Sequence, residues 1–460
     1  AEIYSRSLGD ADTARVQLRR ATALCLETGL GIDRVSEYFE RRGDFDGLVE
    51  LWGRVLDELP PEGSTGAVAV RLARSRVLAG RLLRPAEAEV EIRKALLGAP
   101  RSVEARLELA GLHLWGDNLA EASAEYLKVL EIDPLNVDVY RGFFRVYDRR
   151  GDLDRAAGAA QALCAVSKDE EGSPEAKVAE QARMAVEAGL VSAMSTPLTR
   201  EGHWALLAHA EEPSSGRELL AAVADYLPLV MPDHLADAGS GGVISLDPGD
   251  ARAARCMVLA RALGVDRVEI CLGQQRGYQA DALPAVATSG RDLGAPRLAI
   301  SETLARDASE GVFRFVVGRA LTHVLTRSLY LEVLSGQKVE LVLAAVVELF
   351  DRGFGAYLGH GPELEDLSRR ISRAVPRRVR RGFEEMARAH GAAGPISVSK
   401  WVRAASRSAE RVGLLLAGDV DAALNVLRSE KASAKRQAEL LRFAVGPHLY
   451  EARRRLGLSV

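Results

Sequence analysis

The residues best spaced for chemistry lie between Phe313 and Tyr330, a segment that the sequence predicts to be one buried helix. Arg319 and His323 are four residues apart there, so both face the same side of the helix. Hydrolytic zinc sites place two imidazoles at this spacing, with a glutamate beside the first that activates water. This chain has Arg319 at the first imidazole position and Ala320 at the glutamate position, and only His323 is kept.

The segments around this helix follow one another in a distinctive order. Two strand-like runs, Pro284–Ala287 and Arg297–Ile300, precede it, and the run Ser406–Glu410 follows it on a later predicted helix. From Ala285 to Ala423 this series resembles the zinc metallopeptidases of the HtpX and CAAX-prenyl-protease type. The resemblance implies a zincin-like α+β domain whose third zinc ligand is the glutamate of a downstream E-x-x-A-D motif. Ser406 stands at the position of that glutamate.

The chain therefore lacks two of the three ligands and the general base of such a site. The permanent charge of Arg319 would also repel zinc. We expect no catalytic residue, no metal and no other cofactor, and we interpret His323 as a core histidine. A buried guanidinium needs an acidic partner, and the resemblance places Glu410 opposite the first ligand position, so Arg319 is expected to pair with Glu410. The alternative is that Arg319 reaches solvent along the helix.

The N-terminal part of the chain repeats. Ala88, Ala122 and Ala156 recur every 34 residues, and such small residues let two helices approach closely. Pro100 and Pro134 end the second helix of successive units. Glycine and aspartate stand at the turns inside the units, as in Gly43-Asp44 and Gly151-Asp152. This pattern resembles the tetratricopeptide repeat.

The repeats imply an α-solenoid whose concave face binds one or more protein partners. The alternative is a spacer that binds nothing. A polar loop beginning at Ser167 ends the repeats, and an amphipathic helix over Glu175–Leu190 is expected to cap them.

We predict a mostly α protein with three parts. Residues 1–166 form tetratricopeptide-like repeats, residues 167–194 a linker and capping helix, and residues 195–460 an α+β degenerate metallopeptidase-like domain. Strands are expected at residues 268–272, 285–288 and 296–300, where β-favouring residues lie between Gly and Pro.

The segment Gly361–Ala389 is rich in arginine. One interpretation is a site for an anionic partner. The other, which the sequence favours, is a solvated helical surface neutralised by neighbouring carboxylates. The arginines are Arg369, Arg370, Arg373, Arg377, Arg378, Arg380 and Arg381, and the carboxylates are Glu363, Glu365, Asp366, Glu384 and Glu385.

The composition limits the classes of partner and location. A net charge of -3 at a pI near 6.3 gives no global basic field, so no nucleic-acid partner is expected. The four cysteines show no C-x-x-C spacing and are interpreted as core residues. No apolar run reaches the length of a membrane span. A cytoplasmic location is favoured, with a periplasmic one as the alternative if a signal peptide preceded Ala1; the oligomeric state is left open.

These features together predict a non-catalytic protein-interaction scaffold or assembly subunit, of bacterial type, with a pseudoenzyme domain kept for its shape. The alternative is a metal-dependent peptidase with unconventional ligands, for which His323 would be essential. A third interpretation, an adaptor for an envelope or motility machine, rests on composition and domain type alone.

Overall fold

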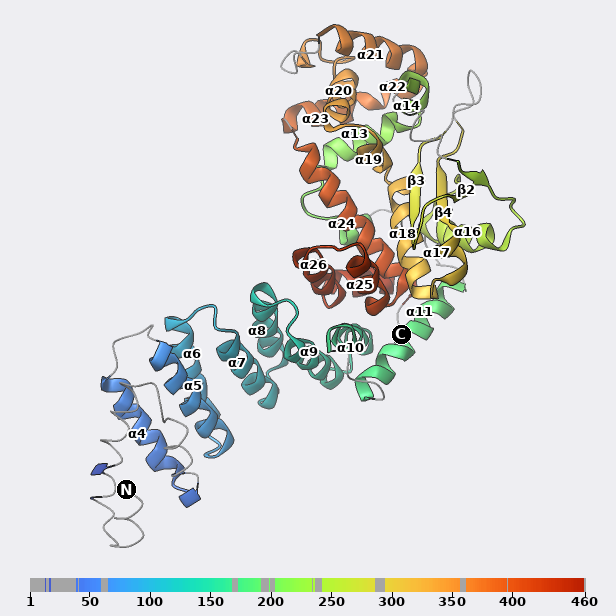
Figure 1. Ribbon diagram of the computed structural model, residues 1–460. Coiled ribbons are helices and arrows are strands. Elements are labelled where there is room, and N and C mark those ends of the chain that lie inside the picture. Colours follow the sequence, from blue (N-terminus) through green and yellow to red (C-terminus); the bar gives the residue numbers. More distant parts are fainter. Residues whose placement is uncertain are drawn as a thin grey trace. The chain divides into compact units, whose positions relative to one another are not determined.

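Helices dominate the computed structural model of the chain (Figure 1). The structure describes residues 13, 16, 17, 39, 41–58, 65–167, 173–191, 198, 203–233, 235, 242–285, 294–355, 361–394 and 396–458. Helix makes up 74% and strand 4%, which confirms the predicted mostly α class. Among the described helices, none is both long and apolar enough to cross a membrane.

The chain divides into two compact units, residues 1–152 and residues 153–460. The first unit consists of helices that pack on their neighbours in sequence. They are α4 (Phe45–Glu58), α5 (Thr65–Gly80), α6 (Pro85–Gly98), α7 (Val103–Trp115), α8 (Leu119–Ile132) and α9 (Val137–Arg149). Helices α7 and α9 begin 34 residues apart, and so do α6 and α8, which matches the period predicted from the sequence.

Residues 34 apart also make the same local bonds in this unit. The side chain of Ser102 caps α7 by accepting from the backbone N–H of Ala105, at 3.2 Å. Asn136 caps α9 by accepting from Val139, at 3.3 Å. Each cap satisfies an N–H group that the first helical turn leaves without a partner.

The turn between the two helices of each repeat contains one residue in the left-handed backbone conformation, with a positive φ. Gly43, Leu83, Asp117 and Gly151 have φ values of 68°, 54°, 60° and 67°. Glycine adopts this conformation without strain and aspartate tolerates it, as the sequence predicts for Gly43 and Gly151. Leu83 is the exception, because its Cβ clashes with the backbone in this region.

The two compact units divide at residue 152, inside the segment predicted to form repeats. Helix α10 (Leu153–Ser167), the second helix of the last repeat, belongs to the second unit. Its Gln161 donates a hydrogen bond to the backbone oxygen of Gly418 at 2.7 Å. Arg428 donates to the backbone oxygen of Ala165 at 2.9 Å. The small residues that let repeat helices pair thus also let α10 pack on the C-terminal helices.

Helix α11 (Pro174–Val191) follows α10 and packs on it. It also contacts α16 (Ala251–Leu263) and α24 (Val398–Ala417). A Cβ at Gly418 would meet Val186 of α11 at 2.7 Å, so the helix lies directly on the end of α24. The segment expected to cap the repeats is therefore part of the second unit's core.

A four-stranded sheet lies within the second unit, in the order β1-β2-β4-β3. Strands β1 (Ile244–Ser245) and β3 (Ala280–Leu283) flank β2 (Glu269–Gly273) and β4 (Arg297–Ser301). The central pair is parallel and both outer pairs are antiparallel. Strand β4 is buried along its whole length, as expected for a strand covered on both faces.

Two of the three predicted strands lie within one residue of β2 and β4. The prediction of a strand at residues 285–288 was wrong at its start, because the strand in this region, β3, ends at Leu283. Pro284 follows and has no N–H to donate to the sheet. Residues 286–288 lie outside the described residues.

Helix α18 (Glu310–Leu325) packs on β3 and β4 with one face and on α24 with another. Its Phe313 and Phe315 and Trp401 of α24 are fully buried. The remaining helices of the second unit pack on one another, and several of them also on α18 or α24. They are α12 (His203–Leu207), α13 (Ser214–Ala224), α14 (Leu227–Val230), α17 (Glu302–Asp307), α19 (Leu329–Val333), α20 (Gly336–Val347), α21 (Gly361–Ala374), α22 (Arg377–Arg381), α23 (Phe383–Ala393), α25 (Val420–Ser429), α26 (Ala434–Ala444) and α27 (Pro447–Leu456).

Candidate functional site

The predicted site residues lie on the two helices that pack most extensively, α18 and α24. Arg319, Ala320 and His323 belong to α18, and Ser406 and Glu410 belong to α24. The structure thus brings these two helices against each other. It does not join the five side chains into one cluster.

His323 is a buried histidine with both ring nitrogens facing partners on the protein. Its Nδ1 lies 2.8 Å from the hydroxyl of Ser328. Its Nε2 lies 3.6 Å from a carboxylate oxygen of Glu332. Burial lowers the pKa of His323, opposed by the charge of Glu332 and aided by that of Arg319. This is the environment expected of a neutral core histidine.

Arg319 pairs with an acid that the sequence did not indicate. Its Nη1 lies 2.7 Å from a carboxylate oxygen of Glu430, which follows α25. The guanidinium also lies over the ring of Phe315, 5.5 Å from its centroid. The predicted pair of Arg319 with Glu410 is therefore wrong in its partner.

Glu410 is 1% exposed and is held by two other arginines. Arg407 lies 3.3 Å from it, and Arg436 of α26 contacts it more closely. Arg436 also reaches Glu430 at 3.4 Å, so Arg319 and Glu410 are members of one network without touching. Glu430 and Arg436 of this network come from segments beyond α24, so local spacing around α18 and α24 cannot reveal them.

Ser406 is engaged within its own helix, where its hydroxyl donates to the backbone oxygen of Val402 at 3.1 Å. Ala320 is packed in the core and has no group that could take up a proton. Across the part of the chain that the structure describes, no three His, Cys, Asp or Glu side chains are grouped as metal ligands.

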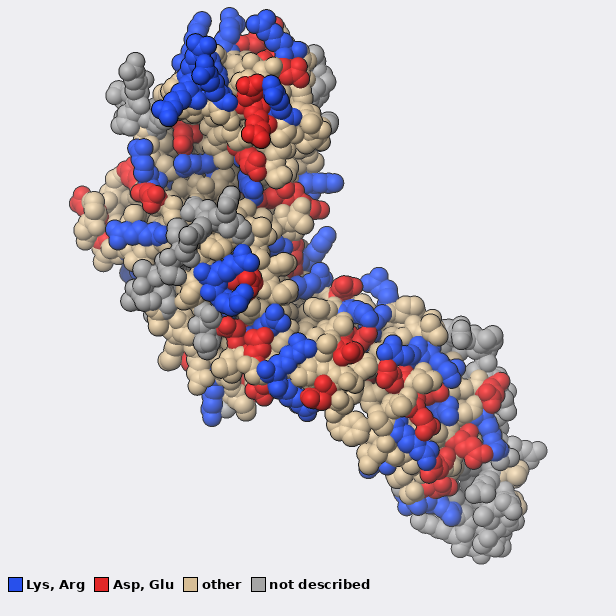
Figure 2. All heavy atoms as spheres, turned by 180° about the vertical axis from the view of Figure 1, so that it is seen from behind, with Lys and Arg blue, Asp and Glu red and all other residues tan. Residues whose placement is uncertain are grey.

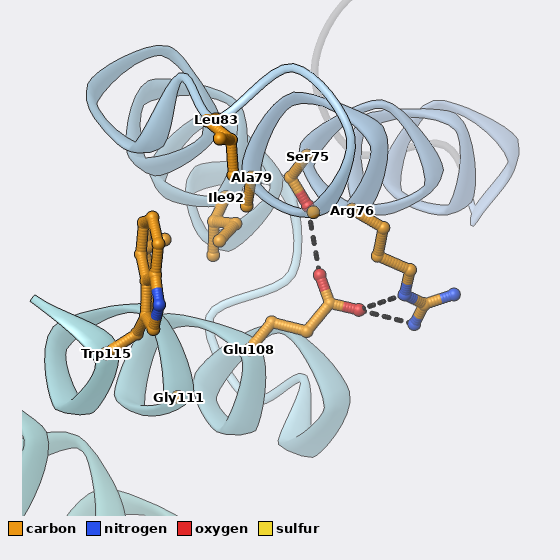
Figure 3. A pocket seen from close by; sticks show the side chains of 10 residues that line it. Ser75, Arg76, Ala79, Leu83, Ile92, Glu108, Gly111 and Trp115 are labelled. Atoms are coloured by element: carbon orange, nitrogen blue, oxygen red, sulfur yellow. Dashed lines mark hydrogen bonds and ion pairs between the residues drawn. The ribbon is translucent and has the colours of Figure 1, made fainter. Parts of the chain in front are cut away.

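A second feature, which the sequence reasoning missed, is a groove in the first unit between α5 and α7 (Figure 3). It has a volume of about 390 Å³. The residues that line it are Ser75, Arg76, Ala79, Gly80, Leu83, Ile92, Glu108, Gly111, Leu112 and Trp115. Helices α5 and α7 are the first helices of successive repeats.

One end of the groove is apolar and open. The indole of Trp115 stands across from Leu83 and Ile92 in Figure 3. Trp115 is 57% exposed and Leu83 is 67% exposed, although both are large apolar side chains. Gly111, one turn before Trp115, leaves the floor of the groove without a side chain. Such an end can accept an apolar side chain of a ligand.

The other end of the groove is polar and fixed. Glu108 accepts a hydrogen bond from the hydroxyl of Ser75 at 3.0 Å and forms an ion pair with Arg76. Burial raises the pKa of Glu108, and the charge of Arg76 opposes this rise. Arg76 also contacts Glu104, so its guanidinium is held between two carboxylates.

Two signals in the sequence could have pointed to this groove. One is the large aromatic residue Trp115 near the end of its helix. The other is Leu83, at the turn position where the other repeats have Gly43, Asp117 and Gly151. A bulky residue such as Leu83, held in a backbone conformation that favours glycine, is a candidate for function.

Comparisons with known proteins add no family. None of the models of known protein families matches the chain. A comparison with curated proteins finds none that is similar in sequence.

Proposed function

We propose that this chain is a non-catalytic protein-interaction scaffold, whose first unit binds a segment of a partner protein in the groove between α5 and α7. The observation that carries the proposal is the pair of exposed apolar side chains, Trp115 and Leu83, at the open end of that groove. Exposed apolar side chains in a concave site mark binding surfaces, and tryptophan is enriched among residues that dominate binding energy.

The repeat pattern supports this proposal. The 34-residue spacing of α6 and α8 and of α7 and α9, with equivalent caps and turns, is typical of tetratricopeptide repeats. Stacked helical repeats form extended surfaces that bind peptides and proteins. A partner segment would place one apolar side chain beside Trp115. The fixed pair of Glu108 and Arg76 would bind polar groups of the same segment at the other end of the groove.

In the second unit, we propose a degenerate peptidase domain that has kept its shape. Arg319 at an imidazole position, and the bonds of His323 to Ser328, support a packing role for α18. The active-peptidase alternative requires a metal at His323. Metal analysis, described in the Discussion, separates the two.

The test of the scaffold is selection of binders from a displayed library of random peptides on the full-length chain. The binding of selected peptides is then measured by isothermal titration calorimetry, which does not depend on Trp115. We expect Trp115→Ala to weaken binding by at least about tenfold, as for a dominant contact residue. The matched control is Leu97→Ala, because Leu97 is 69% exposed but lies on α6 and does not line the groove.

Two results would count against the proposed site. One is equal binding by the Trp115→Ala variant and the wild type. The other is an equal loss of binding in the Leu97→Ala variant, which would show that the effect is not specific to the groove.

A further inference from the structure

Six exposed arginines gather on α21 and α22 and form what we call the arginine surface. They are Arg369, Arg370, Arg373, Arg377, Arg378 and Arg381. Figure 2 shows a dense group of basic side chains at the top of the view, where α21 and α22 lie in Figure 1. Residues 361–382 hold seven arginines against three carboxylates, a local net charge of +4 in a chain whose net charge is -3.

Two of the five carboxylates expected to neutralise this surface pair with other basic residues. Glu363 forms an ion pair with Lys338 of α20, and Glu384 pairs with Arg388 at 2.6 Å. Asp366 does pair with arginines of the surface, at 2.7 Å from Arg370 and 3.6 Å from Arg369.

That leaves four arginines of the surface. In the described part of the chain, no carboxylate lies within ion-pair distance of any of them. They are Arg373, Arg377, Arg378 and Arg381. The neutralised surface favoured by the sequence therefore holds only around Asp366, and the charge near α22 is uncompensated.

Helix α22 is held in place beneath these charges. Pro376 precedes it, and Arg380 donates a hydrogen bond to the backbone oxygen of Ser372 in α21 at 2.7 Å. Val379, at the centre of α22, is 40% exposed and has arginines on both sides. A single apolar side chain framed by cations suits the headgroup layer of a bilayer, where cations meet phosphates and apolar groups lie slightly deeper.

We propose that the arginine surface docks the protein on a membrane that carries anionic lipids. Mobile headgroups can each move to a guanidinium, so binding needs no complementary shape. A protein partner would need a packed interface of about 1,000 Å² or more, and α22 is only one turn and a half long. A single-stranded nucleic acid would need exposed aromatic side chains on which its bases could stack. Phe383, which follows α22, is buried.

The rest of the chain makes this attraction directional. With +4 on residues 361–382, the remaining residues carry a net charge of -7. A negative membrane therefore attracts the arginine surface, while the remaining residues together carry charge of the same sign as the membrane. The attraction acts within about a Debye length, roughly 8 Å at physiological salt, so only the surface itself contributes.

The test is flotation of the full-length chain with vesicles of phosphatidylcholine alone or with about one third phosphatidylserine, an anionic content of the kind that attracts polybasic segments. We expect binding only to the anionic vesicles, and less of it as salt is raised. The variant Arg373→Gln, Arg377→Gln, Arg378→Gln, Arg381→Gln should lose on the order of a hundredfold in partitioning, since each basic residue near such a surface contributes several-fold.

Two further variants sharpen the result. The corresponding four Arg→Lys changes should keep most of the binding, because a headgroup layer responds to charge and not to guanidinium geometry. Removing four exposed arginines elsewhere, Arg101→Gln, Arg261→Gln, Arg276→Gln and Arg403→Gln, changes the net charge equally and should leave binding unchanged.

Three outcomes would overturn the proposal. They are equal flotation with neutral vesicles, equal loss in the control variant, and binding to RNA through the same arginines without binding to anionic vesicles. Circular dichroism of each variant verifies that it is folded.

Discussion

Gly318 of α18 and Gly413 of α24 lie directly against each other. A Cβ added to Gly318 would be 3.2 Å from the Cα of Gly413. A Cβ added to Gly413 would be 2.7 Å from the backbone oxygen of Phe315 and 3.1 Å from Cγ of Arg319. The two helices that carry the peptidase-like positions are therefore joined at a crossing where neither has room for a side chain.

Gly413→Ala should destabilise the second unit, because its methyl group meets the backbone oxygen of Phe315, which cannot rotate away. We expect a loss of about 1–3 kcal/mol in the free energy of unfolding, the usual cost of overpacking a core. Urea unfolding followed by circular dichroism measures it. The control is Gly361→Ala in α21, where nothing lies within 4 Å of an added Cβ. Equal stability of the two variants would contradict the close crossing.

Leu83→Gly should stabilise the first unit. The φ of 54° at Leu83 costs a side chain about 1–2 kcal/mol, and part of that gain is lost because glycine is more flexible when unfolded. We expect a net gain of about 0.5–1 kcal/mol by thermal or urea unfolding. The matched Leu127→Gly change, at a partly exposed position in the middle of α8, should instead destabilise by about 1 kcal/mol. A loss of stability in the Leu83 variant would refute the strain at this turn.

Glu410→Gln should be severely destabilising. Glu410 is 1% exposed and balances the charges of Arg407 and Arg436. Removing one partner of a buried pair leaves an uncompensated charge and costs about 3–5 kcal/mol. Glu363→Gln, which breaks a surface pair with Lys338, should cost less than about 1 kcal/mol. Similar unfolding midpoints for the two variants would show that the network around Glu410 contributes little.

Stability should fall in mild acid because of His323. Burial lowers its pKa below the ordinary value of 6.5, so the unfolded chain binds the proton more readily than the folded one. The stabilisation is present above about pH 6.5 and is lost as the pH falls through the pKa of the folded state. One such proton contributes up to about 1.4 kcal/mol per pH unit.

The measurement is urea unfolding between pH 7.5 and about pH 5, a window that spans the ordinary histidine pKa. The His323→Gln variant should have a shallower dependence on pH than the wild type. His448→Gln, at an exposed position, should retain the dependence of the wild type. His390 is also buried with a lowered pKa, so the His323 variant should keep part of the slope. If the stability of the His323→Gln variant depended on pH as strongly as that of the wild type, His323 would not be a cause of the loss in acid.

Metal analysis of the purified chain tests the alternative of an active peptidase. We expect zinc well below one ion per chain, because Arg319 brings a permanent positive charge to the face of α18 that holds His323. Elemental analysis after dialysis against zinc provides the measurement. Stoichiometric zinc that disappears in His323→Ala would overturn the scaffold proposal in favour of the peptidase.

The repeat architecture of the first unit could be predicted because it depends on local spacing. Ala88 and Ala122 recur at 34 residues and are both fully buried. The turn residues Gly43 and Gly151 adopt the left-handed conformation that their type favours. In each case the interacting residues lie within one or two adjacent helices, so periodicity and turn chemistry carry the information.

The unit boundary could not be predicted in the same way. Helix α10 has the repeat pattern, yet it packs on α25 and α26 in the second unit. The small residues that make it suitable for a repeat are equally suitable for that contact. A pattern of small residues therefore predicts close helix packing without specifying the partner helix.

By itself, the sequence determined the mostly α class, the 34-residue period, two of the strands and the burial of His323. Tertiary structure alone decided which acid faces Arg319. Arg319 forms an ion pair with Glu430, which is 111 residues away in the sequence. Glu410, four positions after Ser406, forms ion pairs with Arg407 and Arg436 instead. The physical reason is that ion pairs act through space, so their partners depend on how distant helices pack and leave no periodic signal along the chain.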